Sequence, residues 1–170
     1  YGSTYATIAE DPQFAAAILD RVQRNAERAK NHGSVVIWSL GNESGYGENF
    51  VAAGKWLERR DPSRLIHFES EHHILPDHAP DVSPLSLYSR MYASTEDIDR
   101  YFADPKNTRP FIQCEFIHAM GTGPGDIEDY MEQIYRYDGF CGGFVWEWFD
   151  PAVFGGTPPE GRPTSPVAYT

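Results

Sequence analysis

Hydrophobic positions along the chain follow two spacings in turn, one typical of helices and one typical of strands. Between Asp11 and Gly33 they recur at helical spacing, which predicts an amphipathic helix that begins at Asp11-Pro12 and ends at His32-Gly33. Residues 35–40 then form an unbroken apolar run, which predicts a strand buried on both faces. The same change of spacing recurs further on. Strands are expected at 65–69, 85–91, 111–116 and 143–146, and helices at 49–60, 94–102 and 126–137.

Polar residues at helix starts support these assignments. Asp11 is a typical N-cap with proline in the first turn, and Ser94 with Asp97 predicts a capping box. The periodic apolar residues should face the core. They are Phe14, Ile18, Leu19, Val22, Ala26, Phe50, Val51, Leu57, Ile127, Met131, Ile134 and Tyr135, with Tyr137 packing beside them.

Strands that alternate with helices predict right-handed βαβ units and a parallel sheet. Both an open doubly wound sheet and a (β/α)8 TIM barrel have this order. Several strands end in polar residues, namely Asn42-Glu43, Glu69, Tyr92 and Glu115, and the sequence contains no glycine-rich dinucleotide turn. Barrel enzymes collect their chemistry at the C-terminal ends of many strands, so a TIM barrel is the favoured α/β fold.

A complete barrel needs about 250 residues, and this chain offers roughly the last five of the eight strands with their helices. Residues 1–150 are therefore expected to be the C-terminal part of a TIM-barrel catalytic domain, with the missing strands preceding Tyr1. Residues 151–170 are rich in proline and glycine, which predicts an irregular tail or a linker.

Composition excludes some partners. The 170 residues carry a net charge of −11, from 25 acidic and 14 basic side chains, without the clustered Lys and Arg of nucleic-acid binders. No apolar run reaches the length of about 18 residues that would indicate a membrane helix. The chain does not begin with the charged and then apolar residues of a signal peptide, so a cytoplasmic location is expected. Secretion remains an alternative, because the sequence at Tyr1 starts in the middle of a structural pattern. Cys114 and Cys141 are expected to be buried free thiols.

Two strand-end carboxylates carry the clearest chemistry. Glu43 and Glu115 are 72 residues apart, which here corresponds to three βα steps, so they should face each other across one barrel mouth. Cleavage of an acetal needs one carboxylic acid that protonates the leaving oxygen and one carboxylate that attacks or guides water. Asn42 would donate to a sugar hydroxyl, and Gly45 and Gly47 would leave room for the substrate.

Other polar and aromatic residues near these strand ends fit sugar recognition. His118 lies three residues after Glu115 and could bond a further hydroxyl group. Trp146 and Trp148 offer aromatic faces for the C–H faces of a sugar ring. The Tyr92 hydroxyl could donate to Glu115 and keep its carboxylate ionised and aimed.

Long motifs in fixed order carry a resemblance to a known family. "SVVIWSLGNESGYG" and "RPFIQCEFIHAMGTGPG" resemble the acid/base and nucleophile segments of glycoside hydrolase family 2, within it those of the β-galactosidases. "DPSRLIHFE", "SRMYAS" and "GGFVWEWFD" are similar to the intervening and final strands, and the likeness runs from about Asp11 to Asp150.

The resemblance implies a retaining hydrolase of terminal β-D-galactosyl residues, such as those of lactose. In it Glu43 is the general acid/base, Glu115 is the nucleophile, Tyr92 supports the nucleophile and Asn42 contacts the 2-hydroxyl region. His118 and Trp146 would contact the galactosyl unit.

The resemblance also implies Mg²⁺, with Glu43 as one ligand and the other ligands upstream of this chain. Na⁺ is an alternative second ion in the full-length family member. A further alternative is that this chain alone binds neither ion. The isolated 170 residues are expected to be weakly active or inactive.

Other interpretations remain open at this stage. Glu69, Glu71, His72, His73 and His78 fit no compact zinc signature and are expected to form a solvated loop. His67, inside a strand, is expected to be a hydrogen-bonded core residue. The alternative functions are a non-catalytic carbohydrate-binding module and a structural fragment that self-associates through its exposed strand edges.

Overall fold

The computed structural model describes residues 6–69, 71–119, 123 and 125–147. Trp148 and the tail expected at 151–170 lie outside these residues, so both of these predictions stay untested. Among the described residues, no helix is long and apolar enough to cross a membrane.

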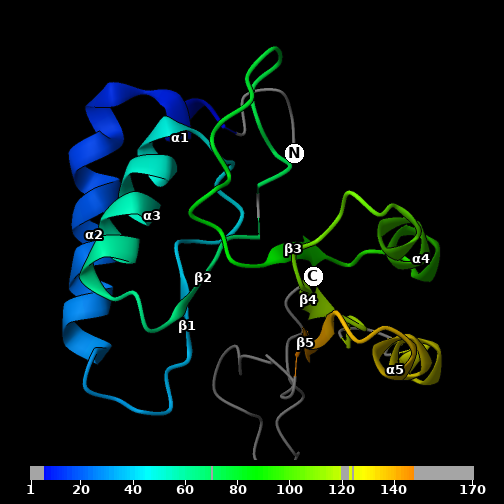
Figure 1. Cartoon of the computed structure of the whole chain (residues 1–170). Coiled ribbons are helices and arrows are strands. Elements are labelled where there is room, and N and C mark those ends of the chain that lie inside the picture. The colour runs from blue at the N-terminus through cyan, green and yellow to red at the C-terminus, as the bar shows by residue number, and fades with distance from the viewer. Residues whose placement is uncertain (1–5, 70, 120–122, 124, 148–170) are drawn as a thin grey trace, which may run out of the picture.

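Helices and strands alternate along the described chain, as the hydrophobic spacing predicts (Figure 1). In chain order they are α1 (Thr7–Glu10), η1 (Pro12–Phe14), α2 (Ala15–Ala29), β1 (Ile37–Ser39), α3 (Glu48–Arg60), β2 (Leu65–His67), β3 (Tyr88–Met91), α4 (Thr95–Ala103), β4 (Phe111–Phe116), α5 (Ile127–Arg136) and β5 (Phe140–Val145). The first predicted helix is thus divided into a 3-10 turn, η1, and a long helix, α2, and the short helix α1 precedes both.

Polar caps begin two of these elements as the sequence predicts. The Asp11 carboxylate accepts the Gln13 N–H at 2.9 Å, and Pro12 occupies the first turn of η1. The Ser94 hydroxyl accepts the Asp97 N–H at 3.1 Å, and the Asp97 carboxylate accepts the Ser94 N–H at 3.4 Å. This reciprocal pair is the expected capping box of α4.

Every described strand pair is parallel, which confirms the expected βαβ organisation. Strand β1 pairs with β2, and β3, β4 and β5 pair in chain order. Ser86, just before β3, connects the two groups, because its N–H donates to the Ile66 carbonyl at 2.8 Å and its hydroxyl accepts the Ile66 N–H at 3.0 Å. The strands therefore follow one another in sequence order.

The helices lie outside this row of strands, with α2 and α3 beside β1 and β2, and α4 and α5 beside β3 to β5 (Figure 1). Among the described residues, the opposite strand face lines a cavity and carries no second helical layer. A doubly wound sheet carries helices on both faces, whereas a barrel carries them on the outside only. The arrangement is that of part of a TIM barrel.

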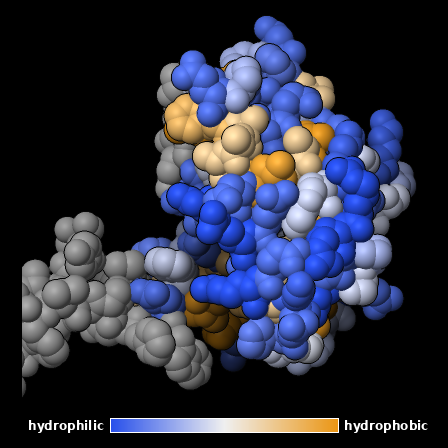
Figure 2. All heavy atoms as spheres, turned by 90° about the vertical axis from the view of Figure 1, so that its left-hand side faces the viewer, coloured by the Kyte–Doolittle hydropathy of each residue, from blue (hydrophilic) through white to orange (hydrophobic). Residues whose placement is uncertain are grey.

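Two hydrophobic clusters join the strands to their helices. One lies under α2 and α3 and includes Trp38, Leu57 and Phe68, and the other lies under α4 and α5 and includes Ile98 and Phe111. Val22 and Ala26 of α2, and Phe50, Val51 and Leu57 of α3, are buried as predicted. The outward-facing surface around α2 is mostly hydrophilic with a hydrophobic patch, as suits an outer layer (Figure 2).

Several burial predictions are wrong. Phe14 is 41% exposed because it belongs to η1 and does not continue the apolar stripe of α2. On α5, Ile127, Met131 and Tyr135 are exposed, and Tyr135 is 81% exposed. The neighbouring stripe of Tyr130, Gln133, Ile134 and Tyr137 packs on α4 and β4 in their place.

The first strand is also not buried on both faces. Trp38 faces the helices and is buried, whereas Ile37 and Ser39 line the cavity on the other face, and Val36, just before the strand, is 64% exposed. The cysteines are free as predicted, but Cys141 is exposed and Cys114 is half-buried. The helices cover the outer strand face, and the described residues leave the inner face partly open.

Candidate active site

The C-terminal ends of the parallel strands gather the polar residues that the sequence pattern singles out. Asn42 and Glu43 follow β1, Glu69 follows β2, Tyr92 follows β3, and Glu115 lies near the end of β4. In a parallel sheet these ends share one edge, so their side chains converge on one mouth.

Three of these strand ends are held in an unusual backbone conformation. Glu43, Tyr92 and Ile117 have positive φ angles of 47°, 51° and 45°. Residues other than glycine rarely adopt the left-handed region, and for the β-branched Ile117 it is a strong outlier. Such strain persists only where the surroundings impose it, and it concentrates at functional sites.

Glu115 is held by Tyr92. The Tyr92 hydroxyl donates to Glu115 Oε2 at 2.8 Å, and the Tyr92 N–H donates to the Glu115 carbonyl at 2.8 Å. Burial raises the pKa of Tyr92 above its ordinary value, and the hydrogen bond to Glu115 raises it further. The phenol therefore stays protonated and acts as a donor. The His118 ring lies 5.6 Å from the Tyr92 ring.

Trp146 lies beside the segment that follows Glu115. The backbone N–H of Trp146 donates to the Phe116 carbonyl at 3.1 Å, and its backbone carbonyl accepts the Ala119 N–H at 2.6 Å. Trp146 is 37% exposed. The structure thus brings Tyr92, Glu115, His118 and Trp146 together.

The β1 side of the mouth is organised by Glu69. The Glu43 N–H donates to Glu69 Oε1, and Glu69 is only 2% exposed. Burial raises the pKa of Glu69, and the charges of both Glu43 and Glu115 raise it further against the lowering effect of the Glu43 N–H. The charges of Glu43 and Glu115 therefore both act on the ionisation of the Glu69 side chain.

Glu69 is the residue of this site to which sequence reasoning gave no role. Like Glu43 and Glu115, Glu69 comes at the end of an apolar strand segment. This shared pattern is the sequence signal that indicates a place for Glu69 in the same site. The expected solvated loop is not fully solvated either, because Glu71 is also buried.

The interpretation of Gly45 and Gly47 as space for the substrate is wrong. A Cβ on Gly45, whose φ is +68°, would lie 2.5 Å from the Cα of Ala6, and a Cβ on Gly47 would lie 2.6 Å from Glu10 Oε1. Both glycines are buried against the N-terminal segment. They allow α1 to approach the turn after Glu43, and Gly45 also adopts the left-handed turn conformation.

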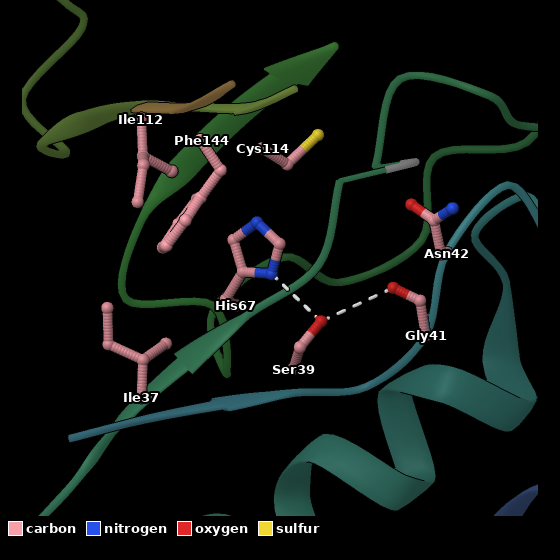
Figure 3. Close-up of a pocket in the computed structure, with 8 residues that line it drawn as sticks. All are labelled: Ile37, Ser39, Gly41, Asn42, His67, Ile112, Cys114 and Phe144. Carbon is pink, nitrogen blue, oxygen red and sulfur yellow. Dashed lines mark hydrogen bonds between the residues drawn. The ribbon is translucent and has the colours of Figure 1, made fainter. Parts of the chain in front are cut away.

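A cavity of about 290 Å³ lies on the inner face of the strands (Figure 3). Its walls come from four strands or strand ends: Ile37, Ser39, Gly41, Asn42, His67, Ile112, Cys114 and Phe144. Asn42 lies at the end of the cavity toward the loop that carries Glu43 (Figure 3).

His67 is a hydrogen-bonded core residue, as the sequence predicts. Its ring nitrogens lie 3.0 Å from Ser39 Oγ and 2.7 Å from Ser89 Oγ. Burial lowers the pKa of His67 to about 4, so the ring is neutral near pH 7. It orders the inner face of the strands.

The described residues do not by themselves complete the magnesium site that the resemblance implies. Glu43 offers one carboxylate, but within the described segments no three His, Cys, Asp or Glu side chains form a group that could hold a metal ion. A divalent cation bound at Glu43 would need further ligands from outside these segments.

A buried ion pair fastens the loop after Glu69, and its removal should destabilise the chain. Arg109 donates to the two Glu71 oxygens at 2.7 and 2.6 Å, and the side chains are 28% and 5% exposed. The Arg109→Met variant leaves the Glu71 carboxylate buried without its partner. We expect the free energy of unfolding to fall by about 3 kcal/mol, as measured by urea denaturation.

The Asp20–Arg24 pair provides a matched control. Its N–O distance is 2.8 Å, but the side chains are 40% and 76% exposed. Because water screens exposed pairs, Arg24→Met should leave the urea midpoint almost unchanged. Equal shifts in the two variants would contradict the structural role of the Glu71–Arg109 pair.

The chain belongs to glycosyl hydrolases family 2, because residues 1–160 match the TIM barrel domain of that family. This match confirms both the family and the fold class predicted from the motifs. Among the relatives, the β-galactosidase of Actinobacillus pleuropneumoniae is 53% identical over 150 residues, and the β-galactosidase of Staphylococcus xylosus is 43% identical over 147 residues. These matches cover 88% and 86% of this chain, but the chain spans only 15% of either relative's length.

Solved structures show the same architecture at greater distance. A β-glucuronidase of Ruminococcus gnavus superposes with a TM-score of 0.58 at 20% identity, covering 91% of this chain and 32% of that chain. At this identity the likeness concerns the fold alone.

Proposed function

We propose that this chain is the C-terminal part of the catalytic domain of a retaining β-galactosidase. One observation carries the proposal: Glu43 follows β1 and Glu115 lies near the C-terminal end of β4, at the same edge of the parallel strands, and both raise the pKa of the buried Glu69. Two carboxylates at one mouth suit glycoside hydrolysis. The relatives named β-galactosidase favour galactose as the sugar.

The proposed reaction has two displacements. Glu115 attacks the anomeric carbon from the α face while the bond to the leaving oxygen breaks, and Glu43 transfers its proton to that oxygen. A water molecule then attacks the anomeric carbon from the β face, Glu43 accepts a proton from the water, and the bond to Glu115 breaks. Two inversions give net retention.

Tyr92 supports both steps by donating to Glu115 Oε2 at 2.8 Å. This hydrogen bond leaves the other oxygen of the carboxylate for the attack and stabilises the charge that returns when the sugar is released. We assign to Asn42 the 2-hydroxyl region of the sugar. We assign to His118 the other galactosyl hydroxyls and to Trp146 an aromatic wall against the ring.

Turnover assays test this function directly. The enzyme that contains this chain should hydrolyse nitrophenyl β-D-galactoside in clear preference to the matching β-D-glucuronide and β-D-mannoside. The isolated 170 residues should turn over the galactoside roughly a hundredfold more slowly or not at all, because the open inner strand face positions the sugar poorly.

The comparison has distinct outcomes. Preference of the enzyme for the glucuronide would overturn the galactosidase proposal. Galactoside binding without turnover by the enzyme would favour the carbohydrate-binding alternative. Full activity of the isolated chain would contradict the expected need for upstream strands.

A further inference from the structure

The loop between β2 and β3 holds the turn that carries Glu43. Its hydrogen bonds with that turn include the Glu43 N–H donating to Glu69 Oε1, the Tyr46 N–H donating to the His73 carbonyl at 2.8 Å, and the Tyr46 hydroxyl donating to the Asp81 carbonyl at 2.9 Å. These contacts are at the start and end of the segment 43–46. The segment therefore takes its position from β2 as well as from its own strand.

The loop itself is fastened to residues at the starts of β3 and β4. Glu71 pairs with both terminal nitrogens of Arg109, and Arg109 Nη1 also donates to the Leu87 carbonyl at 3.1 Å. The guanidinium carbon lies 5.6 Å from the centre of the Tyr88 ring. Glu69 is thus presented from a backbone segment that a buried ion pair holds in place.

The bond between Glu69 and the Glu43 N–H bears on the conformation of Glu43. Its φ of 47° is in the left-handed region, which a glutamate adopts only when its surroundings impose it. The Glu69 side chain lies next to this peptide group, is only 2% exposed, and accepts its N–H. If the acceptor were withdrawn, Glu43 could relax and its carboxyl group would leave the position required for proton transfer.

We propose that Glu69 is a positioning residue for Glu43. The Glu69 carboxylate accepts the backbone N–H of Glu43 and so holds the Glu43 side chain where it can protonate the leaving oxygen. The inference rests on the proposed function. The placement of Glu43 depends on the position of the Glu69 acceptor oxygen and not on a proton carried by Glu69.

Two conservative variants separate acceptor geometry from charge. Glu69→Gln keeps an acceptor oxygen at the same reach but loses the charge. Glu69→Asp keeps the charge but withdraws the acceptor by about 1.5 Å, one C–C bond. Both are made in the enzyme that contains this chain, and melting curves verify that each variant is folded.

The readout is kcat/KM on two galactosides that differ in their need for acid assistance. Phenyl β-D-galactoside has a poor leaving group and needs a proton, whereas dinitrophenolate departs without one. We expect Glu69→Asp to lose at least about tenfold on the phenyl galactoside and less than about threefold on the dinitrophenyl galactoside. Glu69→Gln should recover most of the loss on the phenyl galactoside.

Two results would overturn the inference: equal losses on both galactosides, or a Gln variant that is worse than the Asp variant, which would show that the charge matters and the acceptor does not. A wild-type enzyme without galactosidase activity would end the proposed function itself. A wild-type enzyme with activity and an unaffected Glu69→Asp variant would end only the positioning role.

Discussion

Replacement of Glu115 with glutamine, in the enzyme that contains this chain, should lower kcat/KM for nitrophenyl β-D-galactoside by about 10⁴-fold or more. An amide cannot attack the anomeric carbon, so the first displacement is lost. The Tyr92 hydroxyl, which donates to Glu115 Oε2 at 2.8 Å, still finds an acceptor in the glutamine side chain. The fold should therefore persist, and the melting temperature should stay near that of the wild type.

A carboxylate outside the mouth supplies the control. Glu132 lies on the exposed side of α5, and Glu132→Gln should retain wild-type activity. A Glu115→Gly variant given azide and galactosyl substrate with a good leaving group should form α-galactosyl azide, because azide enters from the face that Glu115 occupied. Formation of the β anomer, or activity that survives in Glu115→Gln, would remove Glu115 from the nucleophile role.

Replacement of Glu43 with alanine should lower kcat/KM for phenyl β-D-galactoside by about 10²- to 10⁴-fold, the usual contribution of general acid catalysis. The loss should be much smaller for dinitrophenyl galactoside, whose leaving group departs without a proton. The nucleophile is intact in this variant, so the glycosyl-enzyme still forms from the activated substrate and its hydrolysis becomes slow.

Azide distinguishes Glu43 from Glu115. In Glu43→Ala it should accelerate turnover of the dinitrophenyl galactoside and yield β-galactosyl azide, because it attacks the glycosyl-enzyme from the vacated β face. Formation of α-galactosyl azide would instead make Glu43 the nucleophile and Glu115 the general acid/base. A loss that is the same for both leaving groups would mean that Glu43 does not act as the acid.

Sequence reasoning succeeded where a local pattern reports a local constraint. Proline and aspartate at the start of η1, and the Ser94–Asp97 capping box, satisfy helix ends whatever the rest of the molecule does. The reasoning failed on α5, where Met131 and Tyr135 have helical spacing but lie beside the stripe that packs on α4. Periodicity shows that a helix has an apolar side, but the neighbouring element decides which residues it covers.

The same limit applies to the mouth of the barrel. Apolar strands that end in an acid predicted where Glu43 and Glu115 would lie, but an identical ending at Glu69 went without a role. The role proposed for Glu69 comes from its hydrogen bond with the backbone N–H of Glu43, which follows a different strand. Gly45 and Gly47 were misjudged for a related reason, since the space they leave is taken by Ala6 and Glu10 and not by a ligand.

The order of residues along the chain was enough to predict the family, the alternating strands and helices, and the two acids at strand ends, because each is encoded by residues that are close along the chain. Folding decided which faces are covered and that a third carboxylate, Glu69, is buried beside the Glu43 backbone, and it produced the Tyr92–Glu115 hydrogen bond that the sequence predicts. These features join residues from different strands, and their distances exist only once β1 to β5 have assembled side by side.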